Sequence, residues 1–444
     1  MKVIIIGGDA AGISAASQVK RLKAEYDVTV FERGDYISYA ACGIPYFVSK
    51  AVGSMDDLLE LSLDEARGKR GVDVRTGHTV TAIDPLSQSV TVEHGGGRFD
   101  EPYDRLVIAT GARPGTMGID TRDFSNVFTM NDLYDAGAIK KFFSEQKPRS
   151  VAVIGGGYIG LEAAESFREL GIETTLVHRR EDLHRSFEKE ISDIIKAKLS
   201  EKGVHLGLGK PISGLEKRGG KVAVIRGGDD PEFDAVLLAI GVEPNSGIAE
   251  AAGIELGANR AIRVNEYMET SAEGIYAAGD CATATINTFG IEVHAPLALK
   301  ANKQGFFAGM NIAGRRAPFG GVMNTAITKV FDLGVARTGL SFDQAVDLGL
   351  EPEKTVVTSR DRARYYPGAS PFHTVLISSG KDRRVLGAQM AGRIESVKRI
   401  DVFAAAIHNR MTVEGVFDLD LAYAPPFSPV YDPVLLAARI ARKK

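Results

Sequence analysis

The residue best suited to redox chemistry in this sequence is Cys42, one of only two cysteines. It lies in the stretch Ser38–Tyr46, which reads Ser-Tyr-Ala-Ala-Cys-Gly-Ile-Pro-Tyr. A thiolate attacks disulfides and peroxides, and the oxidised sulfur that results can be reduced again by an electron donor. Because this stretch follows a glycine-rich turn and a strand ending in Glu32, we expect the reactive end of a bound nucleotide to reach Cys42.

The second cysteine, Cys281, follows an apolar strand-to-turn segment, Ile275–Asp280. Buried cysteines are common and inert, so we predict that Cys281 is a packed residue and not a second redox thiol. The Asp280 carboxylate can bond a hydroxyl of a ribose or polyol.

The elements before Cys42 have the pattern of a dinucleotide-binding fold. Lys2–Ile6 is a β-branched run typical of a strand buried on both faces, and Gly7–Gly12 (Gly-Gly-Asp-Ala-Ala-Gly) follows it. A helix is predicted from Ile13 to about Lys23, and a second strand, Asp27–Phe31, ends at an acid. Such a turn places a pyrophosphate at the helix N-terminus.

Two residues modify this first fingerprint. Glu32, at the end of the second strand, is placed to bind ribose hydroxyls, which favours FAD or NAD over NADP at this site. Asp9 occupies the position of the middle glycine and brings a side chain close to the phosphates.

A second fingerprint begins at Gly155. Ser150–Ile154 is a predicted strand, Gly155–Gly160 (Gly-Gly-Gly-Tyr-Ile-Gly) a complete turn, and Leu161–Leu170 a helix. The next strand, Glu173–Val177, is followed by His178-Arg179-Arg180 and not by an acid. An acid at this place would repel a 2′-phosphate, whereas arginines can pair with it. We therefore expect NADPH here. A solvated pair of arginines would leave NADH as the alternative.

The spacing of these motifs predicts an α/β protein with two Rossmann-like nucleotide-binding domains, one inserted in the other, and a C-terminal α+β domain. We expect the FAD-binding domain in residues 1–112 and 244–322, the NAD(P)-binding domain in 113–243, and the C-terminal domain in 323–444. In the last, Ala326–Phe331 and Thr374–Ser378 are strand-like and Val397–Arg410 has helical periodicity.

Composition narrows the functional classes. Charged residues make up 25% of the 444 residues, hydrophobic residues 44%, and the formal net charge is −3. This is an ordinary globular balance, and it predicts neither nucleic acid nor a membrane as a partner. The N-terminus enters a strand directly and the two cysteines lie far apart, so we expect a cytoplasmic protein.

Three further motifs are informative: Ala109-Thr110-Gly111, Gly241–Asn245 and Ala278-Gly279-Asp280. With them, the recognisable motifs span essentially the full length of the chain. Together with the two fingerprints, they resemble the FAD- and NAD(P)-dependent pyridine nucleotide-disulfide oxidoreductases. Members with an internal disulfide carry Cys-x₄-Cys, whereas Phe47 stands five residues after Cys42. The chain thus resembles the single-cysteine branch, which contains coenzyme A (CoA) disulfide reductases, persulfide reductases and NADH oxidases.

Two C-terminal motifs, Arg364–Gly368 and Leu421–Ser428, resemble the CoA group most closely. The resemblance implies that the C-terminal domain forms a homodimer. It also implies that Tyr423 and Tyr365 act catalytically across the interface, near the cysteine of the partner subunit.

The resemblance also assigns binding residues by motif position. The expected FAD residues are Gly7, Ala11, Gly12, Glu32, Arg33, Val80, Ala109, Thr110, Gly111, Gly279, Asp280, Leu297, Ala298 and Phe427. The expected NAD(P)H residues are Gly155, Gly157, Tyr158, Ile159, Gly160, Glu162, His178, Arg179, Arg180 and Gly241. The expected CoA residues are Ser14, Gln18, Arg21, Ser38 and Arg70, of which the first three share one face of the first helix. No metal site is expected.

The function that the resemblance implies is reduction of CoA disulfide, or of CoA persulfide or polysulfide, by NAD(P)H through FAD and a mixed disulfide at Cys42. One alternative is an NADH oxidase or peroxidase with a cysteine sulfenic acid. None of the eight histidines lies beside Gly12, where the oxidase group carries one, and this favours the reductase. A redox-sensing flavoprotein is a further alternative.

Overall fold

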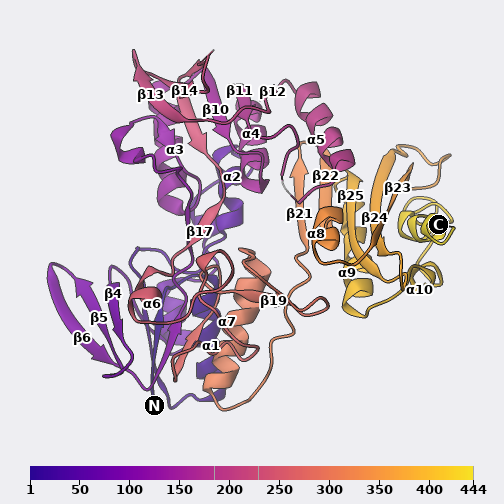
Figure 1. Ribbon diagram of the computed structural model, residues 1–444. Coiled ribbons are helices and arrows are strands. Elements are labelled where there is room, and N and C mark those ends of the chain that lie inside the picture. Colours follow the sequence, from indigo (N-terminus) through magenta and orange to yellow (C-terminus); the bar gives the residue numbers. More distant parts are fainter. Residues whose placement is uncertain (185, 229, 444) are drawn as a thin grey trace. The chain divides into compact units, whose positions relative to one another are not determined.

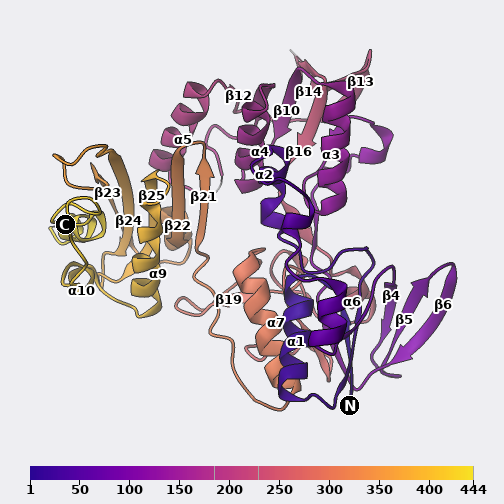
Figure 2. The ribbon, with the colours of Figure 1, turned by 180° about the vertical axis from the view of Figure 1, so that it is seen from behind.

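The computed structural model describes residues 1–184, 186–228 and 230–443 (Figures 1 and 2). The chain divides into two compact units. Unit 1 contains Met1–Gly115, Asn131–Leu133 and Val242–Val322. Unit 2 contains Thr116–Met130, Tyr134–Gly241 and the chain from Met323 onward.

A five-stranded parallel sheet of order β18-β7-β1-β2-β3 forms the centre of unit 1. Strand β18 is the last of these in the sequence, and the chain passes through residues of unit 2 before it reaches β18. The predicted insertion of one nucleotide-binding fold in another is therefore confirmed. The strands are β1 (Lys2–Ile6), β2 (Asp27–Phe31), β3 (Asp73–Arg75), β7 (Arg105–Ile108) and β18 (Ile275–Ala277).

Two helices of unit 1 lie side by side in both views of the ribbon, α1 (Ala10–Leu22) and α7 (Ala298–Ile312). They approach closely because α7 presents glycines: a Cβ at Gly305 would collide with the carbonyl oxygen of Ala11. Helix α1 begins three residues before the predicted start, and α7 was not predicted.

The smaller elements of unit 1 are mostly antiparallel pairs. Before β3 the chain forms a 3₁₀ turn, Asp56–Leu58, and a π-helical turn, Glu65–Lys69. The remaining elements are β4 (Thr79–Asp84), β5 (Ser89–His94), β6 (Gly97–Pro102), β8 (Ala112–Pro114), β17 (Val242–Pro244), β19 (Ala284–Ile286), β20 (Ile291–Val293), α2 (Ile44–Val48) and α6 (Gly247–Ala251).

Unit 2 contains a second five-stranded parallel sheet, of order β12-β11-β10-β16-β9. It repeats the strand–turn–helix pattern of unit 1, with β10 leading into α4. Its strands are β9 (Val127–Phe128), β10 (Ser150–Ile154), β11 (Glu173–Val177), β12 (His205–Gly207) and β16 (Ala235–Leu238). Helices α3 (Leu133–Gln146), α4 (Tyr158–Glu169) and α5 (Lys189–Glu201) and the antiparallel β13 (Gly214–Arg218), β14 (Lys221–Ile225) and β15 (Glu232–Phe233) complete it.

The C-terminal part is an antiparallel sheet of order β21-β22-β25-β24-β23 with helices packed against it, as the α+β prediction requires (Figure 1). The predicted helical stretch at residues 397–410 forms a 3₁₀ turn, Val397–Arg399, followed by α9. The elements are β21 (Ala326–Val330), β22 (Leu333–Gly339), β23 (Pro352–Arg360), β24 (Pro371–Ser379), β25 (Val385–Arg393), α8 (Phe342–Asp347), α9 (Ile400–His408), α10 (Val413–Phe417) and α11 (Pro433–Ala441).

Buried carboxylates join the two five-stranded sheets of unit 2. Glu165 on α4 accepts a hydrogen bond from the Phe331 amide (2.7 Å) and pairs with Lys329. Glu188 accepts from the Phe342 amide at 2.8 Å and is 3.3 Å from Lys354 Nζ. Because removing one partner of a buried ion pair is costly, these contacts hold the C-terminal sheet to the nucleotide-binding fold. No helix among the described residues is long and apolar enough to cross a membrane.

Candidate functional site

The turn after β1 is built for close approach to a phosphate. Gly7 has φ +107°, and a Cβ there would collide with the carbonyl oxygen of Ala109. A Cβ on Gly12 would collide with the carbonyl oxygen of Gly7. Only glycine fits both positions, so the N-terminus of α1 lies against the carboxyl ends of β1 and β7, where a helix N-terminus favours an anion.

Glu32 is held in place at the end of β2. Its Oε2 accepts a hydrogen bond from the Gly8 amide at 2.7 Å, and its Oε1 accepts one from the Gly34 amide at 2.8 Å. The carboxylate is therefore pre-organised beside the glycine turn, where a ribose hydroxyl would meet it. Arg33 beside it is exposed, and Val80 on β4 is buried.

The motif Ala109-Thr110-Gly111 bonds the first segment of unit 1, Met1–Gly115, to its last segment, Val242–Val322. Thr110 Oγ1 donates to the Asn245 carbonyl (2.6 Å), and Asn245 Nδ2 donates back to the Thr110 carbonyl (2.9 Å). Gly111 has φ +69°. These reciprocal bonds fix the segment that leaves the sheet and the one that returns to it.

Asp280 carries a buried oxygen, Oδ1, which has no hydrogen-bond partner in the described chain. Burial raises the pKa of this carboxyl, and the charges of Lys300 and His294 oppose that shift. A buried acceptor without a partner is expensive, and a hydroxyl-rich ligand would satisfy it. The glycine turn, Glu32 and this oxygen together fit FAD.

Asp280 is positioned by two side chains of α7 that sequence reasoning missed. Lys300 Nζ donates to the carbonyls of Gly279 (2.9 Å) and Ala282 (3.1 Å), and Gln304 Oε1 accepts from the Gly279 amide (3.0 Å). Both are buried polar residues one helical turn apart on an otherwise small-residue helix. Leu297 is the N-cap of this helix and Ala298 its first residue.

Cys42 is exposed, in the middle of a 3₁₀ turn, Ala41–Gly43. Backbone hydrogen bonds hold this turn: the Ala40 amide donates to the Leu58 carbonyl and the Gly43 amide to the Ala40 carbonyl, both at 2.8 Å. The thiol thus lies on a structured loop and is open to solvent.

Cys281 is fully buried, as predicted. Its Sγ donates to the carbonyls of Ile108 (3.4 Å) and Ala278 (3.3 Å), and burial raises the pKa of the thiol. A raised pKa disfavours the thiolate, so Cys281 is not suited to nucleophilic chemistry.

The residues expected to bind CoA gather around α1. Ser14 Oγ donates to the Asn302 carbonyl (2.8 Å) and Arg21 Nη1 to Gln18 Oε1 (3.1 Å). The exposed Arg70 reaches this helix, where its Nη1 is 2.8 Å from the Ser17 hydroxyl, whereas Gln18 is buried. Two exposed arginines therefore border one helix face. Their role, and that of Ser38, stays a prediction.

The second glycine turn repeats the geometry of the first. Gly155 has φ +124°, a Cβ there would collide with the Ala239 carbonyl, and a Cβ on Gly160 would collide with the Gly155 carbonyl. The N-terminus of α4 therefore packs against the carboxyl end of β10 as α1 packs in the first turn, and these residues fit NAD(P)H. The flanking positions Gly157, Tyr158 and Ile159 form the start of this helix.

His178 takes the place that Glu32 has in the first site. The Gly156 amide donates to His178 Nδ1 at 3.2 Å, so the neutral ring carries its proton on Nε2, a buried atom with no partner in the described chain. Burial lowers the pKa of this imidazole, and the charges of Arg179 and Arg180 add to that effect. A neutral donor flanked by two cations suits an anion better than an acid would.

Two predicted residues of unit 2 remain, Glu162 and Gly241. Glu162 on α4 accepts from Thr328 Oγ1 at 2.7 Å, and burial raises the pKa of its carboxyl. Gly241 has φ +111° at the exit of the fold.

Tyr365 and Tyr423 are exposed, with 76% and 47% of their surface accessible. A hydrogen bond between their hydroxyls raises the pKa of Tyr423. Phe427 is 74% exposed, and the Ala363 amide donates to the Pro425 carbonyl (3.1 Å), which ties the two tyrosine motifs together. A gathering of exposed aromatic side chains is typical of a protein interface.

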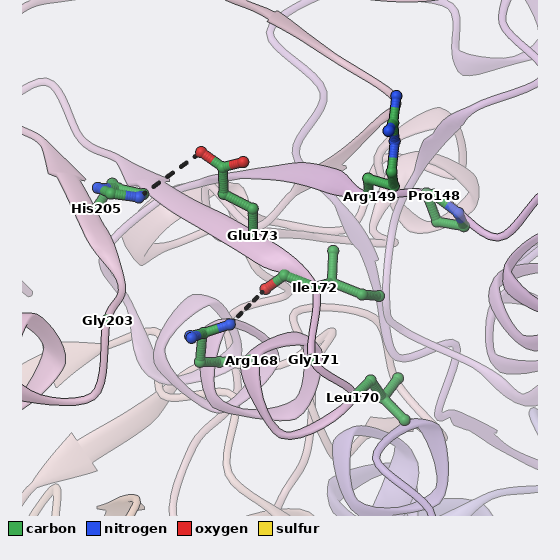
Figure 3. A pocket seen from close by; sticks show the side chains of 9 residues that line it. All are labelled: Pro148, Arg149, Arg168, Leu170, Gly171, Ile172, Glu173, Gly203 and His205. Atoms are coloured by element: carbon green, nitrogen blue, oxygen red, sulfur yellow. Dashed lines mark hydrogen bonds and ion pairs between the residues drawn. The ribbon is translucent and has the colours of Figure 1, made fainter.

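A pocket in unit 2 lies at the amino ends of the parallel strands, whereas the second glycine turn follows the carboxyl end of β10 (Figure 3). Its residues precede the strands: Arg149 stands before β10, Glu173 opens β11 and His205 opens β12. Figure 3 shows Glu173 paired with His205 at 3.7 Å. Because nucleotides bind outside the carboxyl ends of parallel strands, this pocket is not the dinucleotide site.

Comparison with known proteins identifies the family. Residues 1–305 match the family described as pyridine nucleotide-disulphide oxidoreductase, and residues 325–433 match the dimerisation domain of the same family.

Similar proteins carry related names. The chain is 39% identical over 442 residues to an NAD(P)H coenzyme A polysulfide/persulfide reductase from Pyrococcus horikoshii, covering 99% of this chain and 98% of that one. It is 34% identical to an NADH oxidase from Methanocaldococcus jannaschii (100% and 99% covered) and 29% identical to a coenzyme A disulfide reductase from Staphylococcus haemolyticus (99% and 99%).

A solved structure of an NAD-dependent persulfide reductase from A. fulgidus superposes with a TM-score of 0.96 at 38% identity, covering 100% of this chain and 83% of that one. A family match over more than half of the chain and a full-length relative at this identity agree with the two nucleotide folds described above. The chain belongs to the pyridine nucleotide-disulphide oxidoreductase family.

Proposed function

We propose that this oxidoreductase reduces CoA disulfide or CoA persulfide with electrons from NAD(P)H, through FAD and Cys42. The observation that carries the proposal is the contrast between the two thiols. Cys42 is exposed, on the segment whose Ser38 and Tyr39 amides bond to the first nucleotide turn, and Cys281 is buried with a raised pKa. A lone accessible thiol has to form its disulfide with a small-molecule thiol such as CoA.

The two glycine turns divide the cofactors between the units. FAD, held by the first turn, Glu32 and Asp280, would accept a hydride and pass an electron pair to sulfur when bound. NAD(P)H belongs at the second turn. There the neutral His178 and the cations of Arg179 and Arg180 support NADPH as the preferred donor, because they pair with a 2′-phosphate.

The chemistry of Cys42 follows from thiol–disulfide exchange. Its thiolate attacks one sulfur of CoA disulfide, a bond forms between Cys42 and one CoA, and the other CoA leaves as a thiolate. Two electrons then break the mixed disulfide and regenerate the Cys42 thiolate with release of the second CoA. With CoA persulfide, attack on the sulfur bonded to CoA gives the same mixed disulfide, and hydrosulfide leaves as the S–S bond breaks.

Tyr423, assisted by Tyr365, is the proposed donor to the departing CoA thiolate. The hydrogen bond between the two phenols raises the pKa of Tyr423, so it stays protonated at neutral pH and able to donate. Both lie in the part of the chain that matches the dimerisation domain, and we propose that they serve the active site of a partner subunit in a homodimer.

CoA itself would lie along α1. The exposed Arg21 and Arg70 border this helix and supply positive charge for the phosphates of CoA, with Ser14, Gln18 and Ser38 as polar contacts.

An NADH oxidase is the second candidate, because one full-length relative carries that name. In that case Cys42 would form a sulfenic acid and oxygen would take the electrons. Both functions use the same thiol but leave different adducts on it.

Mass spectrometry of the intact purified protein distinguishes the two. The reductase predicts a CoA-sized adduct that maps to Cys42 and is removed by dithiothreitol. A gain of oxygen atoms on Cys42, with no CoA adduct after incubation with CoA disulfide, would instead select the oxidase. A Cys281→Ser variant is the control, and its adduct should equal that of wild type.

A further inference from the structure

Asp9 stands where the dinucleotide fingerprint usually has glycine, and it has an unusual contact. It is the N-cap of α1, but its side chain does not cap that helix. Instead Asp9 Oδ1 accepts a hydrogen bond from the backbone amide of Tyr39 at 3.2 Å. Tyr39 lies three residues before Cys42, so the carboxyl connects the FAD-binding turn to the segment of the reactive thiol.

A second bond runs parallel to the first. The Ser38 amide donates to the Gly8 carbonyl at 3.0 Å. On its other side the segment is held by residues 58–60: the Ala40 amide donates to the Leu58 carbonyl, and the Glu60 amide to the Ser38 carbonyl, both at 2.8 Å. The segment before Cys42 is thus fixed between the fingerprint turn and a neighbouring loop, and Asp9 supplies the side-chain contact.

The surroundings of Asp9 disfavour its charged form. Asp9 is partly buried. Burial, with the nearby carboxylates of Glu32 and Asp280, raises its pKa to about 6, and the backbone amides of Tyr39 and Ala10 oppose that shift. The Tyr39 side chain also faces this cluster: burial, and then the charges of nearby carboxylates, Asp9 first, raise the pKa of its phenol, which therefore stays neutral. A glycine at this position would avoid the cost of the buried charge. The hydrogen bond to Tyr39 is what the aspartate adds.

We propose that Asp9 is a positioning residue that couples the FAD-binding turn to the segment carrying Cys42, and so fixes the thiol for electron transfer. The inference rests on the proposed function only in taking Cys42 as the reactive thiol. A loosened segment would leave the sulfur in a range of positions, and loss of a fixed geometry slows reactions strongly.

Hydrogen exchange at single-residue resolution on the FAD-bound protein tests the coupling. The Tyr39 amide should exchange about tenfold faster in Asp9→Gly and Asp9→Ala than in wild type, because a hydrogen bond to a charged acceptor is lost. Asp9→Asn keeps an oxygen acceptor and should stay within about threefold of wild type. The neighbouring Ala40 amide, which donates to Leu58, should not change in any variant. Unchanged exchange at Tyr39 in Asp9→Gly and Asp9→Ala would overturn the proposal.

A pH series on the wild-type protein keeps the proposal testable even where a variant does not fold. A protonated carboxyl accepts more weakly than a carboxylate. The ratio of Tyr39 to Ala40 exchange should therefore rise as the pH falls through about 6, where Asp9 titrates beside Glu32 and Asp280. A ratio that stays flat between pH 5 and pH 8 would overturn the proposal.

Rapid kinetics connects the contact to turnover. The rate at which CoA disulfide oxidises the reduced enzyme, divided by the rate of flavin reduction by NADPH in the same FAD-bound variant, should fall severalfold more in Asp9→Gly than in Asp9→Asn. Cys42→Ser separates the two proposals. If that variant loses CoA disulfide reduction but the Asp9 variants slow equally, only the positioning role fails. If Cys42→Ser keeps full activity, the proposed function fails.

Discussion

Three acidic side chains converge on the first nucleotide turn, and their surroundings give them different tasks. Glu32 accepts hydrogen bonds from two backbone amides, which fix the orientation of its carboxylate. Asp280 has an unsatisfied oxygen and a raised pKa, so it is prepared for a ligand hydroxyl. Asp9 has a pKa of about 6 and bonds to the protein itself. Residue type alone predicts none of these differences, because burial and hydrogen bonding decide them.

Asp9→Asn should stabilise the protein at neutral pH. The folded-state pKa is raised from 3.8 to about 6, so between these values the folded state binds more protons than the unfolded state, and stability falls as the pH rises. A shift of about 2 units corresponds to a cost of ~3 kcal/mol above pH 6.

Urea unfolding of wild type and Asp9→Asn at pH 4 and pH 7.5 measures this cost. The advantage of the variant should be largest at pH 7.5 and shrink at pH 4, where the aspartate is mostly protonated in the folded state. An advantage independent of pH would contradict the raised pKa.

The cofactor preference depends on the residues that follow β11. Changing Arg179 and Arg180 together to Ala should raise KM for NADPH about tenfold or more, because each lost charged contact to a phosphate costs on the order of 1.5 kcal/mol or more. KM for NADH should change much less. Steady-state kinetics with both donors checks this, and equal changes would argue against a 2′-phosphate site.

At the scale of elements, the two strand–turn–helix units carry the nucleotide sites, and the sequence was sufficient to predict them. Strands β1, β2, β10 and β11 have the predicted limits because a continuous β-branched run and a glycine turn are local signals. Helix α7 and the buried Lys300 and Gln304 escaped prediction, because their role depends on a turn that lies twenty residues away in sequence. The Asp9–Tyr39 contact escaped for the same reason.

The second glycine turn offers a matched pair of substitutions. Gly160→Ala should destabilise the protein by ~1–3 kcal/mol, because the new Cβ would overlap the Gly155 carbonyl in a packed turn. Gly157→Ala meets no atom closer than 3.8 Å and should change stability by no more than ~0.5 kcal/mol. Denaturant unfolding of the two variants compares them directly. Equal destabilisation would show that the close approach at Gly160 is not the limiting contact.

For the whole molecule, the order of domains followed from the positions of the two fingerprints, and the insertion of one fold in the other is confirmed. The exact domain limits stay a prediction. The C-terminal sheet was only partly predicted, since β22 and β25 contain many small residues and lack a clear alternation. The exposure of Tyr365, Tyr423 and Phe427 came from the structure, and it makes a subunit interface at the loops that carry them the natural expectation.

Co-expression of two inactive variants tests whether the active site is shared between subunits. Tyr423→Phe should lower the rate of CoA disulfide reduction by roughly 10- to 100-fold while flavin reduction persists. A mixed dimer of Cys42→Ser with Tyr423→Phe contains one intact site if Tyr423 acts across the interface. The purified mixed dimer, isolated with two different tags, should then regain up to half of the wild-type activity. Activity no higher than in the parent variants would place both residues in one subunit.

The central claim is that electrons leave this protein through the sulfur of Cys42. Anaerobic turnover of CoA disulfide by Cys42→Ser, measured on protein that retains its FAD and is still reduced by NADPH, tests it most directly. The account predicts loss of at least a thousandfold in kcat, because no second accessible thiol exists in the sequence to replace it. Turnover at the wild-type rate would contradict the account.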